Sequence, residues 1–516
     1  MADQEQLNQT TDRQEDTGTG TLLLLSVFTV ATCGLIYELV AGTLASYLLG
    51  DSVTQFSTII GCYLFAMGIG SWLSKYFTKN LLGWFIQVEI LVGMVGGFSS
   101  ALLFLLFAEI EHFRLLLYAI VLITGMLVGL EIPLLMRVLK SKYAFHDLVS
   151  KIFTFDYIGA LLASLIFPLV LVPRLGLIRT SVFFGILNVI VAIIVAHKFE
   201  KKLPSAKYQK TAGWICLFLL LGVFVLADKI TSFSESQVIP GKIIHAESSP
   251  YQRIILSKDG RSLKLHLNGN LQFSSDDEYR YHESLVHPVL LSSEKKNKVL
   301  ILGGGDGLAV REILKHKVDS IILVDLDPAM TELFRNNSML TTLNQDALNN
   351  PKLQIINEDA FSWLRSHGNK YDVVIIDFPD PSNYSLGKLY SDQFFIEISK
   401  HLTPQGRGVI QSTSPYFARK SFWCVANTIA ASGLNALPYH AYVPSFGEWG
   451  FILFAHDEPT IPQLNGIAEF RFVNDKTIQQ MFHFSDDMSF VPTEVNRLNN
   501  QSLVHYFESE WSQYSM

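Results

Sequence analysis

Cysteine and charge are both scarce in this sequence. Four cysteines occur in 516 residues, and no two of them form a Cys-x-x-Cys pair. This spacing gives no disulfide framework and no zinc site, so we expect reduced cysteines and no bound metal. Charged residues make up only 17%, the formal net charge is −7, and no basic stripe is interleaved with aromatic residues. A nucleic-acid partner is therefore not expected.

Apolar residues are abundant instead. They make up 49% of the chain, and the mean hydropathy is +0.28. These values are high for a soluble enzyme and low for a protein that lies wholly in a membrane. A length of 516 residues also exceeds that of one ordinary domain. The composition therefore predicts a membrane part joined to a soluble part.

The first 230 residues divide into a polar start and a series of apolar segments. Residues 1–18 have no apolar period and lack the features of a signal peptide, so we predict a disordered tail. Residues 19–230 contain about seven apolar segments, most of which reach the roughly 20 residues that cross a bilayer. This pattern predicts a multi-pass helical domain in a lipid bilayer. The segments lie near residues 21–48, 54–74, 84–108, 114–137, 152–173, 177–197 and 212–228.

Four acidic residues interrupt these apolar segments, namely Glu38, Glu89, Glu131 and Asp156. Charges inside a membrane are costly and usually face the interior of a helix bundle. They indicate either a polar cavity or ion path, or acids that lie near segment ends or pair with one another. The sequence leaves both interpretations open.

From residue 236 onward the character of the chain changes. Residues 236–298 show short alternating runs separated by turns, which predicts a small antiparallel β-domain. In residues 299–456 strands and helices alternate, which predicts a Rossmann-like, methyltransferase-type doubly wound sheet. Residues 457–516 are a polar and aromatic C-terminal extension without a useful motif. The predicted fold is an α-helical transmembrane bundle followed by an α/β part.

The stretch Val299–Asp327 carries the most informative motif. An apolar run ends in Gly-Gly-Gly-Asp-Gly at residues 303–307, a helical stretch follows, and a second apolar run ends in Asp325. Glycines at such a turn let the backbone approach a ligand, and an acid after the second strand binds ribose hydroxyls. An NAD site, a methyltransferase and a simple tight turn all share this pattern. Asp306 favours a nucleoside that carries an amine, because an acid in the turn repels a pyrophosphate.

Further acids follow other strands of the same domain. Ligands bind beyond the carboxyl ends of the strands in an open α/β sheet, so these side chains should converge on one crevice. Several acids with few bases suit a substrate that carries several positive charges. Each acid taken alone could equally cap the helix that follows it. The set comprises Asp306, Asp325, Asp359, Asp377 and Asp380.

With these motifs the chain, from about Ile239 to Phe454, resembles the spermidine synthase family, the polyamine aminopropyltransferases. Tyr251-Gln252, the segment Asp-Glu-Tyr-Arg-Tyr-His-Glu at residues 277–283, and Gln411 in Gln-Ser-Thr-Ser-Pro add to the resemblance. It implies the transfer of an aminopropyl group from decarboxylated S-adenosylmethionine to a diamine, with putrescine as the expected acceptor. The implied products are spermidine and methylthioadenosine, and no tightly bound cofactor is implied.

The resemblance also implies roles for individual residues. Asp306 would hold the aminopropyl amine, Asp325 the ribose, and Asp359 the adenine amine. For the base that takes a proton from the attacking amine we select Asp377. The residues implied to hold the nucleoside donor are Gln252, Gly303, Gly305, Asp325, Asp359 and Tyr384. Those implied to contact the reacting substrates are Tyr281, His282, Asp306, Asp380 and Gln411.

The acceptor side departs from the family pattern. Phe378-Pro379 stands where a small polar pair is usual, and Ser382-Asn383-Tyr384 replaces Gly-Pro. Thr413 occupies the position of a common Glu, and Phe446 that of a Tyr. The donor side matches better, so the sequence supports aminopropyl transfer more firmly than it supports putrescine as the acceptor.

Two other functions remain open. An S-adenosylmethionine-dependent methyltransferase shares the fold, but it would not need Tyr281, His282 or the pair Asp377 and Asp380. A membrane transporter or sensor would use the soluble domain only to bind a polyamine. The sequence is also compatible with a homo-oligomer.

Lys and Arg are concentrated in the loops after the second, fourth and sixth apolar segments. The positive-inside rule then places the N-terminus in the cytoplasm, and seven crossings would place everything after Asp228 outside. The nucleoside chemistry, however, needs a cytosolic metabolite. We give that chemistry more weight and expect a multi-pass protein of the cell (inner) membrane with a cytoplasmic catalytic domain.

Overall fold

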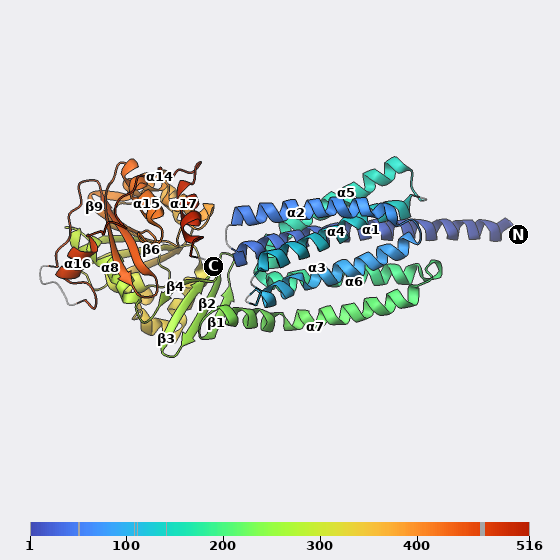
Figure 1. Ribbon diagram of the computed structural model, residues 1–516, viewed down its shortest axis with the longest axis horizontal. Coiled ribbons are helices and arrows are strands. Elements are labelled where there is room, and N and C mark those ends of the chain that lie inside the picture. Colours follow the sequence, from blue (N-terminus) through green and yellow to red (C-terminus); the bar gives the residue numbers. More distant parts are fainter. Residues whose placement is uncertain are drawn as a thin grey trace. The chain divides into compact units, whose positions relative to one another are not determined.

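The computed structural model describes residues 2–49, 52–107, 109–110, 112–140, 142–464 and 470–514. The chain divides after Pro240 into two compact units. The first is a bundle of long helices and the second is an α/β unit, as Figure 1 shows.

Long apolar helices make up the first unit. α1 begins at Ala2, so the structure places a helix in most of the segment that we expected to be a disordered tail. That segment is rich in Gln and Glu, which are good helix formers and continue the apolar helix that follows. The helices are α1 (Ala2–Leu49), α2 (Ser52–Leu73), α3 (Leu81–Leu106), α4 (Phe113–Leu139), α5 (Phe145–Ile166), α6 (Val172–Lys198) and α7 (Ala206–Val238).

Among the described residues, six helical stretches are long and apolar enough to span a membrane, but the stretch Phe145–Lys198 has 54 residues. It folds back on itself. Gly159 of α5 packs against Ala31 of α1, and the Cys33 thiol of α1 donates a hydrogen bond to the Phe184 carbonyl of α6. Residues 159 and 184 of a straight helix would lie about 37 Å apart at roughly 1.5 Å per residue, so the chain reverses between them.

Gly176 is the residue that allows this reversal. Its φ of 71° and ψ of 177° are not helical, and this backbone region is essentially restricted to glycine. The short π-helical turn η2 (Phe167–Leu171) precedes it. Because α5 and α6 are separate antiparallel passes, the helices α1 to α7 make seven passes through the bundle.

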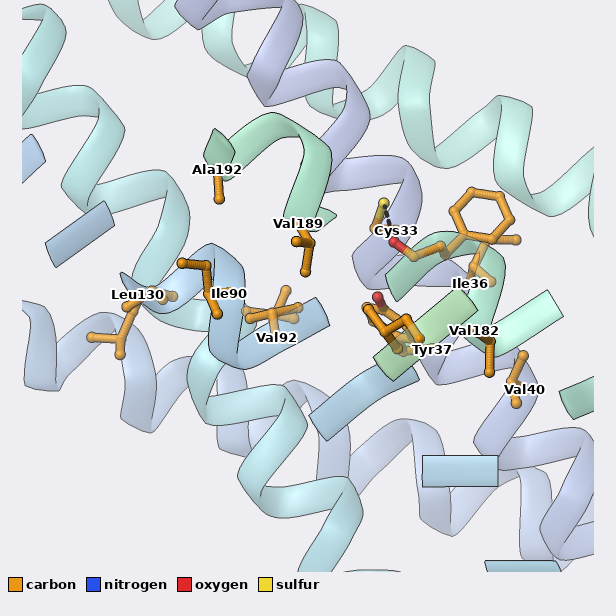
Figure 2. Close-up of a cluster of buried hydrophobic side chains, with 14 of the residues drawn as sticks. Cys33, Ile36, Tyr37, Val40, Ile90, Val92, Leu130, Val182, Val189 and Ala192 are labelled. Atoms are coloured by element: carbon orange, nitrogen blue, oxygen red, sulfur yellow. Dashed lines mark hydrogen bonds between the residues drawn. The ribbon is translucent and has the colours of Figure 1, made fainter. Parts of the chain in front are cut away.

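Small residues bring the helices of the bundle close together. A Cβ atom on Gly129 of α4 would lie 2.2 Å from the Met67 carbonyl oxygen of α2, and one on Gly185 of α6 would lie 2.5 Å from the Gly93 carbonyl oxygen of α3. This backbone contact is typical of helices that pack within a membrane. Figure 2 shows part of the aliphatic core, to which α1, α3, α4 and α6 contribute. A Cβ atom on Gly96 of α3 would lie 2.7 Å from the Tyr37 ring of α1.

The α/β unit begins with an antiparallel meander. Its four strands follow one another in the order β1-β2-β3-β4. Their alternating side chains bury one face, where Ile254, Leu256 and Leu265 join the core beneath the larger sheet. The strands are β1 (Lys242–Ser248), β2 (Arg253–Asp259), β3 (Ser262–Leu267) and β4 (Asn270–Ser274).

A seven-stranded sheet with the order β10-β11-β9-β8-β5-β6-β7 forms the centre of the unit. The strands β5 to β9 are parallel, and β10 and β11 add an antiparallel edge. The fold class therefore agrees with the prediction of a doubly wound sheet behind a small β-domain. The strands are β5 (Lys298–Gly303), β6 (Ser320–Asp325), β7 (Leu353–Asn357), β8 (Tyr371–Asp377), β9 (Leu402–Gln411), β10 (Asn435–Val443) and β11 (Gly447–Ala455).

Both faces of this sheet are buried, because successive residues of each strand point to opposite sides. Val299 and Ile301 of β5 join one core with α8 (Glu278–Ser292) and α9 (Leu308–Ile313), and Leu300 joins the other core. The helices of the second face include α12 (Ala360–Ser366), α14 (Asp392–His401) and α15 (Arg419–Ala431). The remaining helices of the domain are α10 (Pro328–Asn336), α11 (Ser338–Leu343) and α13 (Tyr384–Gly387).

The C-terminal extension packs onto this domain. Leu503 of α17 (Ser502–Trp511) belongs to the core of the second face, and α16 (Asp475–Met481) buries Ile478. The Glu283 carboxylate of α8 accepts hydrogen bonds from the backbone N–H groups of residues 471–473. The extension therefore completes the domain, although its sequence offered no motif.

Candidate active site

The order of the parallel sheet reverses between β5 and β8. β5 and β8 are neighbours, but the chain passes through β6 and β7 before it returns to β8. Gly303 at the end of β5 pairs with Asp377 at the end of β8. Loops that leave two such strands diverge, and ligands bind in the opening between them. The five predicted acids all follow strands at this edge: Asp306 after β5, Asp325 on β6, Asp359 after β7, and Asp377 and Asp380 at the end of β8.

The glycine turn after β5 needs glycine for both conformation and space. The φ angles of Gly303, Gly304 and Gly307 are 82°, 70° and 75°, a region that side chains with a Cβ atom disfavour. A Cβ atom on Gly305 would lie 2.7 Å from Asp325 Oδ2. The turn is therefore shaped by its neighbours as well as by its own backbone.

Asp306 lies within this turn and is 9% exposed. Its Oδ1 accepts a hydrogen bond from the Leu308 N–H at 2.9 Å. Burial raises the pKa of the carboxyl, while the positive charge of His282 opposes that rise. Asp306 is thus a buried acid with one backbone partner at the start of α9.

Asp325 ends β6 and holds the glycine turn. Its two oxygens accept hydrogen bonds from the N–H groups of Gly305 at 3.0 Å and Asp327 at 2.9 Å. Burial raises its pKa to about 6, against the effect of these two donors. Gln252, predicted to contact the donor, donates to Asp327 Oδ2 at 2.8 Å in this structure. The β-meander is thereby fastened to the strand end that carries Asp325.

Asp359 has the capping role that was the alternative to a binding role. Its Oδ1 accepts from the Ser362 N–H at 2.9 Å at the start of α12, and its Oδ2 lies 3.0 Å from Lys388 Nζ. Burial would raise the pKa of Asp359, but Ser362 and Lys388 together lower it. Tyr384 is 39% exposed and stacks edge-on with His505 at 6.0 Å. Neither residue is hydrogen bonded to the other predicted acids.

Asp377 lies at the centre of the predicted constellation. Its Oδ1 accepts a hydrogen bond from the Tyr281 hydroxyl at 2.5 Å. Its Oδ2 lies towards the glycine turn, where a Cβ atom on Gly304 would be 3.2 Å away. Burial raises the pKa of Asp377 to about 6, although the charge of His282 and the Tyr281 hydrogen bond lower it. One oxygen is therefore oriented by α8 and the other faces the turn.

His282 supplies a positive charge between these acids. Its Nδ1 lies 2.8 Å from Glu278 Oε2, one turn earlier on α8. Burial alone would lower the pKa of His282, but Glu278, Asp306 and Asp377 raise it to about 9. The imidazole is then protonated at neutral pH and balances part of the negative charge in the crevice.

Asp380 and Gln411 form a second polar group beside the first. Gln411 Nε2 lies 3.4 Å from Asp380 Oδ1 and 2.9 Å from the Tyr390 hydroxyl, and it also donates to the Phe378 carbonyl. Trp449 Nε1 donates to Gln411 Oε1 at 3.2 Å. Burial raises the pKa of Asp380 to about 7, against the hydrogen bonds from Gln411 and Thr413. The only side-chain donors that contact this carboxyl among the described residues are the neutral groups of Gln411 and Thr413.

The altered wall on the acceptor side is aromatic. Phe446 lies 6.3 Å from the Tyr281 ring and 5.1 Å from the Trp449 ring. The Phe378 side chain is buried against Phe394. Thr413, at the position of a common Glu, points its hydroxyl to Asp380 Oδ2 at 3.4 Å. The site therefore has one acid fewer on this side and more apolar surface.

Three supporting residues were absent from the sequence-based site. Arg311 makes a two-point ion pair with Glu278, with N–O distances of 2.9 and 2.8 Å, and thereby holds the partner of His282. Asp327 links Gln252 to β6. Glu278 lies inside the motif segment 277–283, and the Asp-Pro pair at residue 327 is a helix-start signal. Local sequence patterns could therefore have identified both residues, but not Arg311.

A second cluster of ligand-type atoms lies on α8 and α9, away from the glycine turn. The carboxylate or ring atoms of Glu283, His287 and Glu312 lie within 4.8 Å of one another. Each already has protein partners: Glu283 accepts backbone N–H groups, Glu312 pairs with Arg311, and His287 contacts His316 at 3.0 Å. These contacts tie α8 to α9 and to the C-terminal extension.

The amino-acid sequence is similar to those of known proteins. Residues 278–463 match the family described as the spermine/spermidine synthase domain. The polyamine aminopropyltransferase of Leptospira interrogans is 50% identical over 493 residues, which cover 95% of this chain and 99% of that protein. Polyamine aminopropyltransferase 2 of Ralstonia nicotianae is 53% identical over 499 residues, which cover 95% and 98%.

The likeness to these two relatives extends over the helical bundle as well as the α/β unit, because it covers nearly the whole chain. Among solved structures, the spermidine synthase of Thermotoga maritima matches 48% of this chain and 85% of its own, with 23% identity and a TM-score of 0.44.

Proposed function

This chain belongs to the polyamine aminopropyltransferase family, and from that premise we propose that it transfers an aminopropyl group from decarboxylated S-adenosylmethionine to a diamine. Putrescine is the proposed acceptor, and spermidine and methylthioadenosine are the proposed products. The observation that carries the proposal is the set Asp306, Asp377 and Asp380. Among the described residues, none of these three carboxyls has an ion pair with Lys or Arg.

The proposed donor site surrounds the glycine turn. The backbone of Gly303 and Gly305 would lie against the nucleoside, and Asp325 would accept hydrogen bonds from the ribose. Asp306 would bind the terminal amine of the aminopropyl chain, because a buried carboxyl gains a charge-assisted hydrogen bond when an ammonium group arrives. Gln252, Asp359 and Tyr384 remain proposed donor contacts, and for the first two this requires an exchange of the partners they have now.

The chemistry proposed at Asp377 is removal of a proton. The neutral acceptor nitrogen attacks the methylene carbon next to the sulfonium, a C–N bond forms, and the C–S bond breaks with its electron pair passing to sulfur. The attacking nitrogen becomes positively charged and loses a proton to Asp377 Oδ2, the oxygen that faces the turn. Tyr281 holds the other oxygen, so the carboxyl cannot rotate away. A carboxylate in this position also stabilises the cation as it forms.

The proposed acceptor site lies at Asp380, Gln411 and the aromatic wall. Asp380 would bind an ammonium group of the diamine, and its pKa of about 7 in the free site would fall when that cation arrives. The faces of Trp449 and Phe446 suit the aliphatic chain between the two nitrogens. Thr413 in place of an acid makes this site less suited to acceptors with additional positive charges.

Two alternatives are less well supported by the site. A methyltransferase has no need of an acid inside the glycine turn, and a methyl group offers nothing for Asp306 to bind. A protein that only senses or transports polyamines would have no need of Asp377 held against Tyr281. The buried acids of the helical bundle leave a transport role for that unit compatible with catalysis by the other.

Product analysis with each donor tests the proposed function. The purified full-length protein would be incubated with putrescine and either decarboxylated or ordinary S-adenosylmethionine, and the products identified by mass spectrometry. We expect spermidine and methylthioadenosine with the decarboxylated donor and no methylated amine with the other. Methyl transfer, or binding of putrescine without any product, would reject the proposal in favour of the corresponding alternative.

We further propose that the bundle is embedded in the cell membrane. Its apolar helices meet the length that a bilayer requires, and many large apolar side chains on their outer faces are exposed, among them Leu64, Phe65 and Leu161. The protein should sediment with membranes and resist extraction by salt or alkali, but not by detergent. Recovery in the soluble fraction would reject this location.

A further inference from the structure

The contacts between helices show that every helix of the bundle passes through one common layer. The Tyr63 hydroxyl of α2 donates to the Gly34 carbonyl of α1 at 2.9 Å. A Cβ atom on Gly125 of α4 would lie 2.8 Å from the Tyr63 carbonyl oxygen, and one on Gly159 of α5 would lie 3.2 Å from the Ala31 side chain of α1. These contacts place the middle of α1, α2, α4 and α5 at the same depth.

The other three helices pass through the same layer. The Cys33 thiol of α1 donates to Phe184 of α6, and the next residue along, Gly185, packs on Gly97 of α3. A Cβ atom on Gly97 would also lie 2.8 Å from the Leu220 side chain of α7. Each of the seven helices therefore crosses this layer once, and consecutive helices leave it at opposite ends.

Seven crossings give the bundle two distinct ends. At the first end lie the start of the apolar part of α1 and the loops after α2, α4 and α6. At the second end lie the loops after α1, α3 and α5, and the C-terminus of α7 at Val238. β1 begins at Lys242. The α/β unit therefore leaves the bundle at the second end, opposite the beginning of α1.

Basic residues are concentrated at the first end. Of the 15 Lys and Arg residues between residues 22 and 240, eleven lie there and four lie at the second end. The eleven are Lys75, Lys79, Arg137, Lys140, Lys142, Lys151, Lys198, Lys201, Lys202, Lys207 and Lys210. The four are Arg114, Arg174, Arg179 and Lys229, and one of these, Arg179, is paired with Asp228 at 2.7 Å.

Exposed aromatic side chains accompany the basic residues at the first end. Lys75 Nζ lies 4.1 Å from the Trp72 ring and 5.0 Å from the Tyr76 ring, and both rings are more than half exposed. Tyr208, 74% exposed, stands at the start of α7 among the lysines. Cytoplasmic leaflets are rich in anionic lipids, which attract such basic segments, and cytoplasmic loops carry the excess of Lys and Arg.

We propose that the first end of the bundle faces the cytoplasm and that the α/β unit, with its active site, lies on the extracytoplasmic side of the membrane. This rests on the proposed membrane location and reverses the cytoplasmic placement that we expected from the origin of the nucleoside donor. The structure supports the seven segments counted in the sequence, because α5 and α6 are separate antiparallel passes. With the number of crossings odd, we give the distribution of Lys and Arg more weight than the origin of the donor.

The cysteine content of the α/β unit is compatible with folding outside the cytoplasm. Cys424 is its only cysteine and is fully buried, so no disulfide can form within the unit and no thiol is exposed to oxidants. The reaction itself needs no nucleotide triphosphate. The extracytoplasmic position does require that a membrane transport step for a sulfonium nucleoside supplies the donor, because the donor is made from a cytosolic metabolite.

Cysteine accessibility in the full-length protein tests the placement. Thr78→Cys lies in the exposed loop after α2 at the first end, and Lys317→Cys lies on the exposed surface of the α/β unit after α9. A membrane-impermeant maleimide would be applied to intact spheroplasts or protoplasts of the expression host, and again after lysis. The wild-type protein, whose own cysteines are buried or within the bundle, gives the background.

We expect Lys317→Cys to be labelled in intact cells to the same extent as after lysis, and Thr78→Cys to be labelled only after lysis. The reverse pattern would overturn the placement while leaving the membrane location intact. Recovery of the protein in the soluble fraction would overturn both. Neither result depends on activity, so the placement and the proposed reaction fail separately.

An activity measurement provides an independent test. Intact spheroplasts that contain the protein would be given the decarboxylated donor and putrescine from outside, with a soluble cytoplasmic enzyme as the lysis control. Methylthioadenosine should appear in the medium at a rate within about twofold of that after lysis, because the donor need not cross the membrane. A rate that rises more than about tenfold on lysis would place the active site inside.

Discussion

Both units of this protein bury carboxyl groups, but they treat them differently. In the α/β unit, Asp325 accepts two backbone N–H groups, Asp377 accepts the Tyr281 hydroxyl, and Glu278 pairs with Arg311. In the bundle, Glu89 and Glu131 are 0% exposed and face each other, and neither accepts a hydrogen bond from any other described residue.

The two units therefore differ in whether a buried carboxyl group can remain ionised. The partners in the α/β unit keep several carboxylates in place near neutral pH, which suits a site that awaits a cation. The bundle offers its two glutamates no compensating charge, and an ionised carboxyl without a partner is very costly in an apolar interior. Only a proton or a transient cation can satisfy that pair. The predictions that follow test the contrast, beginning with the largest expected effect.

Asp377→Asn should abolish most of the catalytic activity. The amide has the size of the carboxyl but cannot take the proton, so we expect turnover to fall by about 10²–10⁴-fold. Binding of methylthioadenosine, measured by calorimetry, should be nearly unchanged. Asp380→Asn provides the matched comparison, because it should act mainly on the KM for the diamine. Near-normal turnover of Asp377→Asn at saturating diamine would move the base to Asp380 or to water.

Glu278→Gln should destabilise the α/β unit. It leaves the 7% exposed Arg311 and the protonated His282 without their main counter-charge, and breaking a buried ion pair costs about 3–5 kcal/mol. Hydrogen exchange monitored by mass spectrometry can follow the two units separately. Exchange should quicken in the strands of the α/β unit and not in the bundle. A variant as stable as the wild type would show that the pair contributes little.

Asp306→Asn should weaken the binding of the decarboxylated donor. A hydrogen bond between a buried charge and its partner contributes roughly 1.5–3 kcal/mol, so affinity should fall about 10- to 150-fold. Methylthioadenosine, which lacks the aminopropyl amine, is the control and should bind almost as before. An equal loss for both ligands would mean that Asp306 shapes the turn rather than binding the amine.

The affinity for the diamine should rise with pH. Burial raises the pKa of Asp377 to about 6 and of Asp380 to about 7, so both are largely protonated at pH 5 and ionised at pH 8. Because a cation binds the ionised form, the dissociation constant should fall more than about tenfold between these values. Asp380→Asn should flatten the dependence, and a flat profile in the wild type would contradict the assignment.

The raised pKa values of Asp377 and Asp380 also determine how the stability of the folded state changes with pH. These carboxyls hold protons more tightly in the folded state than in the unfolded state. Their contribution to the free energy of unfolding is therefore fully present below about pH 4. It is lost as the pH rises through the folded-state pKa values of about 6 and about 7. Without ligand, the α/β unit should lose stability over that window by this contribution, and added spermidine should restore part of it.

Glu131→Gln should have the smallest effect on stability. No partner is lost when this side chain becomes neutral, so we expect a change within about 1 kcal/mol, in contrast to Glu278→Gln. Thermal unfolding in detergent and hydrogen exchange in α4 would measure it. A large loss would show that the pair Glu89 and Glu131 has a structural role that the contacts do not reveal.

The sequence alone determined the features that depend on neighbouring residues. The glycine turn at residues 303–307, the acid at the end of β6 and the long apolar helices all follow from patterns within about 30 residues. The convergence of acids after β5, β6 and β8 also followed, because parallel strands bring their carboxyl ends to one edge. The family resemblance rested on these same local motifs, and the relatives support it.

Only the tertiary structure decided which partner each of these residues has. Gln252 reaches Asp327, Lys388 reaches Asp359 and Tyr281 reaches Asp377 across 75, 29 and 96 positions of the chain. Such pairs depend on how strands and helices pack, which no local pattern encodes. The reversal at Gly176 is a different case, because it was visible in both the sequence and the structure. The sequence divided the 54-residue apolar stretch Phe145–Lys198 into two segments, and the structure shows the physical basis of that division, a non-helical Gly176 at which the chain turns back.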